Sequence, residues 1–147
     1  MMRLPTLLSS LLLMLLATDA CAQQLRDGAF TAHYAAMSST DLSPEIAARY
    51  GIRRGDGLGL LIVNTRQDNA DGTSHAVLAS AQGLVRDLLG DTQALKLRRV
   101  QIDGGDDLLA EFSFTPLQVL RFELTVQPQG APRPLTVNFQ QQFFGND

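Results

Sequence analysis

The sequence predicts an all-β protein, an immunoglobulin-like antiparallel β-sandwich of about seven strands with one short helix after strand one. Apolar and polar residues alternate strictly at 108–114 and again at 120–126, as they do in strands that bury one face. Turn-forming clusters separate similar runs along the chain, and there is no strand–helix–strand alternation. The short connection Thr115–Leu117 predicts that the two central runs pair as a hairpin in the middle of the sandwich.

The first 22 residues have the pattern of a cleaved signal peptide, so they are excluded from the fold. A basic start precedes an apolar run at 4–17 that is too short to span a bilayer. The tripeptide Ala20-Cys21-Ala22 fits the small-x-small rule for cleavage after Ala22. We therefore expect residues 23–147 to form a single β-sandwich domain in the periplasm, with no transmembrane span.

Cys21 is the only cysteine, and cleavage after Ala22 would remove it. The mature chain would then contain no thiol, disulfide or cysteine metal site. Lipid attachment at Cys21 is an alternative, although Thr18 and Asp19 depart from the pattern that such attachment requires.

The charge balance does not indicate a nucleic-acid partner. The chain carries 12 Lys and Arg against 15 Asp and Glu, a net charge of −3, and the signs are interspersed. The only basic doublets are Arg53-Arg54 and Arg98-Arg99, which are too isolated to follow a phosphate backbone.

The first predicted strand, 27–37, places Phe30 and Tyr34 on its inner face and His33 on its outer face. A short helix follows at 43–51. Its start is marked by Ser43 as the N-cap and Pro44 at the first helical position, and Gly51 is suited to end it.

The remaining predicted strands are separated by polar or glycine-rich turns. The run at 58–64 is apolar on both faces, which predicts an interior position in its sheet. The apolar phase slips within 93–103, which we interpret as a β-bulge near Arg98-Arg99. The two further predicted strands are 75–86 and 135–144.

All nine aromatic residues lie within 30–50 or 112–144. Aromatic side chains contribute the largest burial per residue, so we expect them to share one layer. The first strand should then pack near the last, with Tyr34 close to Phe139.

The chemistry-bearing residues do not form a recognised catalytic or metal-binding pattern. The two histidines, His33 and His75, are not accompanied by a G-x-S-x-G or H-E-x-x-H motif. The acidic turn at 103–107 does not have the spacing of a calcium loop. We therefore expect no enzymatic activity, no cofactor and no metal.

Several segments of the chain resemble the family of exported bacterial proteins called domain of unknown function 4426. The resemblance begins at His33-Tyr34-Ala35-Ala36, continues through Leu42–Ala47 and Tyr50-Gly51-Ile52, and recurs near Phe112, Phe122 and Phe139. The chain departs from the family pattern at Ala35, Met37 and Ser38. The resemblance implies an extracytoplasmic location in a Gram-negative bacterium, and it does not imply an activity.

The leading functional hypothesis is a non-enzymatic module that binds another component of the cell envelope. Binding residues on a rigid sandwich usually lie in its loops, so we expect contacts within 37–57. The candidate contact residues are His33, Ser39, Thr40, Arg53, Arg54 and Asp56. The sequence indicates neither the identity of the partner nor the oligomeric state.

Two alternatives belong to other classes. The protein could carry a small apolar ligand between its sheets, which would require an enclosed cavity above about 300 Å³. It could also be a hydrolase-like enzyme that uses His33 together with Tyr34 or Ser39.

Overall fold

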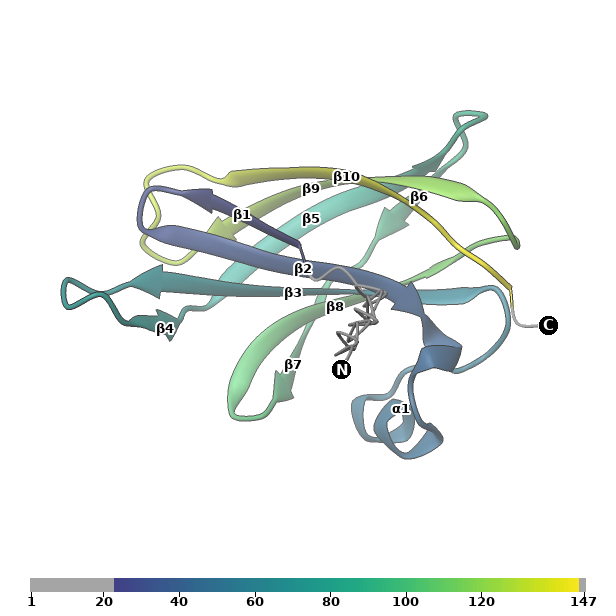
Figure 1. Cartoon of the computed structure of the whole chain (residues 1–147), viewed down its shortest axis with the longest axis horizontal. Coiled ribbons are helices and arrows are strands. Elements are labelled where there is room, and N and C mark those ends of the chain that lie inside the picture. Colours follow the sequence, from purple (N-terminus) through teal and green to yellow (C-terminus); the bar gives the residue numbers. More distant parts are fainter. Residues whose placement is uncertain (1–22, 146–147) are drawn as a thin grey trace, which may run out of the picture.

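The computed structural model describes residues 23–145, and the predicted signal peptide lies outside the described residues. Two antiparallel sheets pack face to face, so the predicted all-β sandwich is confirmed (Figure 1). The finer description as immunoglobulin-like stays a prediction.

Sheet A is the larger sheet and has the strand order β1-β2-β3-β8-β7, with β4 also paired to β3. Its strands are β1 (Gln23–Asp27), β2 (Phe30–Ser38), β3 (Leu58–Asp68), β4 (Ser74–Ala76), β7 (Arg98–Ile102) and β8 (Gly105–Ser113). Sheet B has the order β10-β9-β5-β6. Its strands are β5 (Ala79–Asp87), β6 (Thr92–Leu95), β9 (Val119–Pro128) and β10 (Leu135–Gln142).

The described residues form more strands than predicted, in part because two predicted strands each change sheets partway along. The run at 75–86 divides into β4 in sheet A and β5 in sheet B. The run at 93–103 divides in the same way into β6 and β7. The β-bulge predicted near Arg98-Arg99 is therefore wrong, because a sheet change shifts the apolar phase just as a bulge does.

The predicted central hairpin is also wrong. β8 pairs with β3 and β7 in sheet A, whereas β9 pairs with β5 and β10 in sheet B. Their apolar faces meet across the interior, where the rings of Phe112 and Phe122 lie edge to face at 5.1 Å. Alternation indicates that a strand buries one face, but it does not identify the strand's hydrogen-bonding partner.

The predicted helix is present as α1 (Pro44–Tyr50), just after a short 3-10 helix, η1 (Ser39–Asp41). The Ser43 side chain accepts a hydrogen bond from Ile46 N, and Gly51 ends the helix with a φ of 66°. The helix lies between β2 and β3 rather than after the first strand, because Gln23–Asp27 forms an additional edge strand. The sequence did not predict this strand, because four of its five residues are polar and no alternation of apolar and polar residues is visible.

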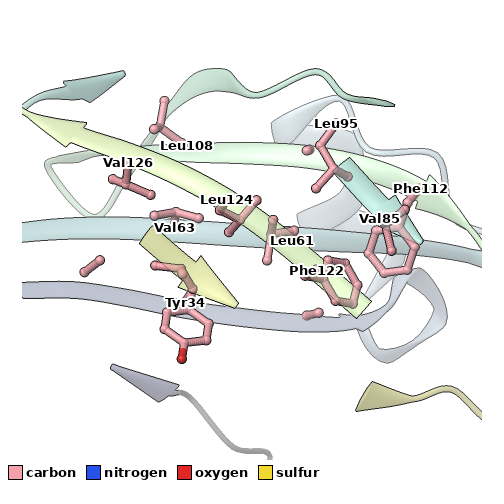
Figure 2. Packing of buried hydrophobic residues seen from close by; sticks show 14 of the residues in the cluster. Tyr34, Leu61, Val63, Val85, Leu95, Leu108, Phe112, Phe122, Leu124 and Val126 are labelled. Carbon is pink, nitrogen blue, oxygen red and sulfur yellow. The ribbon is translucent and has the colours of Figure 1, made fainter. Parts of the chain in front are cut away.

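The core between the sheets is an aromatic layer surrounded by aliphatic side chains (Figure 2). Phe122 stacks on Phe139 at 4.6 Å, and Phe139 lies 4.8 Å from Tyr34. The predicted proximity of Tyr34 and Phe139 is confirmed. This layer links β2 of sheet A to β9 and β10 of sheet B.

β3 is buried on both faces, as predicted for 58–64. Leu61 points into the sandwich core, while Leu60 points to the opposite face of sheet A, and both are fully buried. The second cluster lies under α1 and includes Ala47, Ile52, Leu60, Val100 and Leu109. α1 and the segment that follows it thus cover part of the outer face of sheet A.

We predict that Gly59→Ala destabilises the sandwich by about 1–3 kcal/mol through overpacking. Gly59 pairs with Phe112, and an added Cβ would lie 2.4 Å from Phe112 Cζ. Urea unfolding would measure the loss. Gly105→Ala is the matched control, because its nearest non-neighbouring atom would be 3.6 Å away. Equal stability of the two variants would contradict the close approach.

A second prediction concerns acid stability. Arg133 donates hydrogen bonds to both carboxylate oxygens of Asp27, at 2.6 and 2.7 Å, and holds the pKa of Asp27 below its ordinary value of 3.8. A lowered folded pKa adds stability at pH values above 3.8, and that stability is lost as pH falls through the lowered pKa. The stability gap between the protein and Asp27→Asn should therefore shrink at low pH.

Urea unfolding between neutral pH and pH values below 3.8 would follow that gap. Asp56→Asn serves as the control, since Asp56 is exposed and takes part in none of the ion pairs of the described residues. A gap that is constant with pH would contradict the proposed linkage.

Candidate contact site

The loop that follows α1 is irregular but firmly held. Ser39 is fully buried, and its hydroxyl donates to Gly55 O and accepts from Gly55 N, both at 3.0 Å. This paired contact satisfies both backbone groups of Gly55, so η1 and the loop are joined as one unit.

Three further hydrogen bonds fix the start of the same loop. Arg54 donates from Nε to Leu42 O at 2.8 Å and from Nη2 to Thr40 O at 3.3 Å. The Arg53 amide donates to Glu111 Oε1 at 2.9 Å, which attaches the loop to β8. The Arg54 guanidinium therefore supports the loop and is not simply a free surface charge.

Arg53, Arg54 and Asp56 are all exposed at this loop. The Arg54 guanidinium is hydrogen-bonded to two backbone carbonyls, so Arg53 and Asp56 are the two whose side chains make no hydrogen bond among the described residues. Neither takes part in an ion pair within residues 23–145. Thr40 is half-buried, and its hydroxyl lies 2.9 Å from Ser38 Oγ. A rigid loop thus presents one positive and one negative group with both charges available to a partner.

His33 lies apart from this loop. It is on the outer face of β2, next to Gln24 of β1 and Asn64 of β3 in the strand register. Ser38, at the end of β2, is five residues further along, or about 17 Å at the usual strand rise. The structure therefore gathers Ser39, Thr40, Arg53, Arg54 and Asp56, and leaves His33 outside the group.

The geometry does not assemble the suggested hydrolase site. Tyr34 points inward against Phe139, on the opposite face of β2 from His33, and burial raises the pKa of Tyr34. Ser39 is buried and bonded to Gly55. Neither candidate nucleophile is thus brought to His33.

Within residues 23–145, no group of three or more His, Cys, Asp or Glu side chains is placed to hold a metal ion. No helix in the same region is long and apolar enough to cross a membrane. Glu111 and Glu123 lie in different sheets, so they do not form a pair of neighbouring carboxylates.

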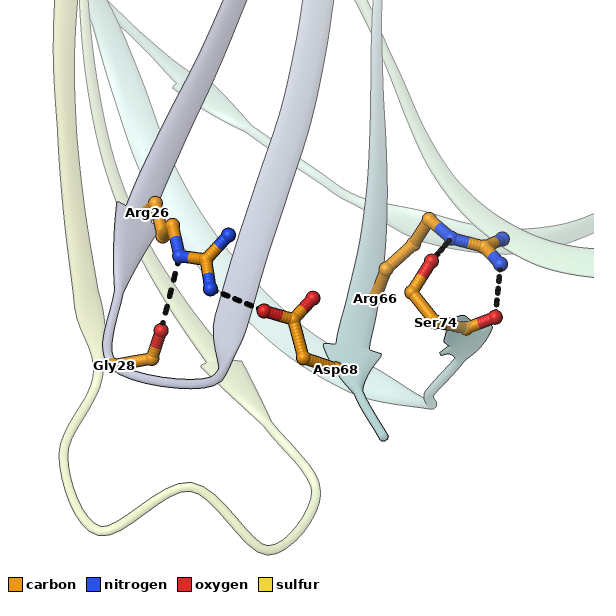
Figure 3. Close-up of polar contacts among 5 residues, drawn as sticks. All are labelled: Arg26, Gly28, Arg66, Asp68 and Ser74. Atoms are coloured by element: carbon orange, nitrogen blue, oxygen red, sulfur yellow. Dashed lines mark hydrogen bonds and ion pairs between the residues drawn. The ribbon is translucent and has the colours of Figure 1, made fainter. Parts of the chain in front are cut away.

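Arginines at the far end of sheet A are also held by the fold (Figure 3). Arg26 donates to Gly28 O and pairs with Asp68, which ties the β1–β2 turn to the end of β3. Arg66 donates to the hydroxyl and carbonyl of Ser74 at 2.9 and 2.8 Å, which holds β4 beside β3. These cations therefore have structural partners.

Sequence reasoning missed a group of exposed apolar residues at one end of the sandwich. They are Leu88, Leu89, Leu117 and Phe144. No periodic pattern marks them, because they come from three separate connecting or terminal segments. Only the fold brings those segments to the same end.

The fold defines a small β-sandwich protein with a rigid polar loop over one sheet. The family described as Domain of unknown function (DUF4426) matches residues 24–146, and the chain belongs to this family. A crystal structure of a DUF4426 family protein from Pseudomonas aeruginosa PAO1 is similar, with 28% identity and a TM-score of 0.72. The match covers 85% of this chain and 96% of the Pseudomonas protein's chain.

Two structures of FetP from uropathogenic Escherichia coli strain F11 are also similar in fold. One was expressed recombinantly in the periplasm and has 9% identity, a TM-score of 0.58, and coverage of 86% of this chain and 95% of that chain. The other is a copper-bound variant with 8% identity, a TM-score of 0.59, and coverage of 86% and 92%. No curated protein matches the chain.

We predict that Ser39→Ala lowers stability by about 1–3 kcal/mol, because it removes the acceptor of Gly55 N and one of the two donors to Gly55 O, the other being Leu58 N at 3.3 Å. Hydrogen exchange at the Gly55 amide should accelerate. Thr40→Ala is the control, since the Thr40 hydroxyl contacts only the Ser38 hydroxyl and the residue is half-buried. Unchanged exchange at Gly55 would show that the loop does not depend on Ser39.

Proposed function

We propose that this protein is a non-enzymatic interaction module for another component of the cell envelope, and that it acts in the periplasm. The supporting observation is the rigid loop at 53–57, which has exposed Arg53 and Asp56 side chains and is fixed by buried Ser39. A loop fixed in advance loses little conformational entropy when it binds.

The pattern of exposed and buried groups supports a binding role for this loop. Three side chains hold the backbone of this region through hydrogen bonds: those of Ser39, Arg54 and Glu111. Arg53 and Asp56 are left to contact an external surface. Their opposite charges favour a polar partner with complementary charges, which such contacts would orient.

The location follows from the signal-peptide pattern of the first 22 residues. The FetP proteins share the fold alone with this chain, and the bound copper is a property of FetP.

The ligand-carrier alternative would use an open pocket at one end of the sandwich, not the enclosed cavity between the sheets that the sequence led us to expect. A pocket of about 310 Å³ opens at one end of the sandwich between Phe30 and Leu135, with the Asp27–Arg133 ion pair at its rim. The space between the sheets is occupied by the aromatic layer, so a ligand would bind at this end. Native mass spectrometry of protein from periplasmic extract would reveal a retained small molecule; an unliganded mass would argue against a carrier.

The proposed function predicts that photo-crosslinkers placed at Arg53 or Asp56 capture an envelope component in living cells. Arg53→Glu should weaken capture by a crosslinker at Asp56 by about tenfold, which corresponds to the loss of one charge-assisted contact. Lys96→Glu is the charge-matched control, because Lys96 is exposed on the crossover between β6 and β7. Equal capture by both variants would contradict a role for the loop.

A further inference from the structure

The apolar end of the sandwich, defined as Leu88, Leu89, Leu117 and Phe144, is unusually exposed. The exposed fractions of these residues range from 61% to 91%. They belong to the β5–β6 hairpin, the β8–β9 loop and the segment after β10, which lie at the same end in Figure 1.

Hydrogen bonds hold these three segments together. Gln118 Nε2 donates to Asp87 Oδ2 at 3.4 Å, which joins the β8–β9 loop to the base of the hairpin. Leu117 N donates to Phe143 O at 2.7 Å, and Phe143 N donates to Gln118 O at 2.9 Å. The apolar side chains are therefore displayed from a connected surface.

Leu117 is notable because its backbone has a φ of 68°. A leucine in the left-handed region is strained, and a glycine or asparagine would relieve the strain. The Leu117 side chain is 64% exposed, so its burial does little to offset the backbone strain. A strained, exposed apolar residue is better explained by an external contact than by the stability of the fold.

A row of hydrogen-bond donors crosses the outer face of sheet B just behind the apolar end. Arg86 and Arg121 are directly opposite each other on β5 and β9. Thr92 of β6 extends the row beyond Arg86, and Gln140 of β10 extends it beyond Arg121. All four strands of sheet B thus contribute one donor.

The two arginines form an unfavourable pair when no anion is present, since like charges directly opposite on neighbouring strands repel. Arg86 has an acidic neighbour, Glu123, at 3.7 Å. Within residues 23–145, the Arg121 side chain takes part in no ion pair or side-chain hydrogen bond of the kind that holds Arg26 or Arg133. A bound anion would remove this repulsion.

Two other acids lie close to the apolar end. Asp87 directs its carboxylate into the hairpin, where Oδ1 accepts from Leu89 N and Asp91 N, both at 2.9 Å. Asp91 is exposed on the hairpin. The arginine row lies on the face of sheet B, so an anion can approach it beside the hairpin.

We propose that this end of the sandwich docks on a lipid bilayer that carries anionic headgroups. Leu88 follows Arg86 by two residues, in the turn after β5, and Leu117 precedes Arg121 by four residues, in the turn before β9. Interfacial residues bury their apolar groups about 5–10 Å into the boundary between headgroups and acyl chains. The apolar end enters that boundary while the two guanidinium groups bind headgroup phosphates.

A bilayer suits the shape of this surface better than a folded partner does. The apolar side chains project from two loops and a terminal segment, so a rigid partner would need matching hollows at separate places. A fluid interface adapts to them, and its phosphates supply an anionic partner for Arg121, which takes part in none of the ion pairs of residues 23–145.

The absence of tryptophan from the chain makes a direct test possible. The variant Leu89→Trp, mixed with vesicles of phosphatidylcholine and phosphatidylglycerol, should shift its emission to the blue and sediment with the vesicles. Leu78→Trp is the control, because Leu78 is 38% exposed at the start of β5, away from the apolar end. An unshifted Leu89→Trp spectrum would overturn the proposal.

The arginine row has a separate readout. One basic residue near an anionic surface contributes about 1 kcal/mol, so Arg121→Gln should weaken vesicle binding about fivefold. Lys96→Gln, which removes an exposed charge on the crossover between β6 and β7, should bind as the unmodified protein does. Equal binding to vesicles of phosphatidylcholine alone, or no effect of Arg121→Gln, would overturn the role of the headgroup phosphates.

Two further measurements separate the apolar contact from simple anion binding. Leu117→Asn should reduce vesicle binding while its melting temperature stays the same or rises, because asparagine tolerates the left-handed backbone. Inorganic phosphate at the concentration of the vesicle phosphate should displace little protein. Complete displacement by inorganic phosphate would replace bilayer docking with a free-anion site and overturn the proposal.

Discussion

The rest of the structure depends on the packing of β8 against β9 across the interior. The ring of Phe112 in β8 lies 5.1 Å from that of Phe122 in β9 and 5.2 Å from that of Phe143, just after β10. One ring of sheet A therefore contacts two separate segments associated with sheet B. Phe122 in turn stacks on Phe139, which contacts Tyr34 of β2. A continuous set of rings therefore connects the sheets, and aromatic rings contribute the largest burial per residue.

This filled interior leaves the outer faces of the two sheets available for different roles. α1 and its apolar cluster cover part of sheet A, and the polar loop at 53–57 lies beside that cover. Sheet B keeps an open outer face with Arg86 and Arg121 in one row. The polar loop and the apolar end are neighbours, because Phe114 N, just before the β8–β9 loop, donates to Gly57 O at 2.9 Å.

The loops combine rigidity with exposure in two different ways. Ser39 is buried to fix Gly55, so the neighbouring Arg53 and Asp56 are presented without a large loss of entropy on binding. At the other surface, Leu117 keeps a strained backbone conformation and an exposed side chain. At the polar loop, a buried hydroxyl holds the backbone that displays charged side chains. At Leu117, a strained backbone displays an apolar side chain.

The sequence by itself determined the β-class, the caps of α1 at Ser43 and Gly51, the two-sided burial of β3 and the proximity of Tyr34 to Phe139. Each of these follows from local periodicity, capping chemistry or the distribution of aromatic residues. Only the tertiary structure decided that β8 and β9 belong to opposite sheets, that Ser39 faces Gly55, and that Arg86 lies opposite Arg121. Alternation specifies which face of a strand is buried, whereas long-range pairing specifies its neighbours.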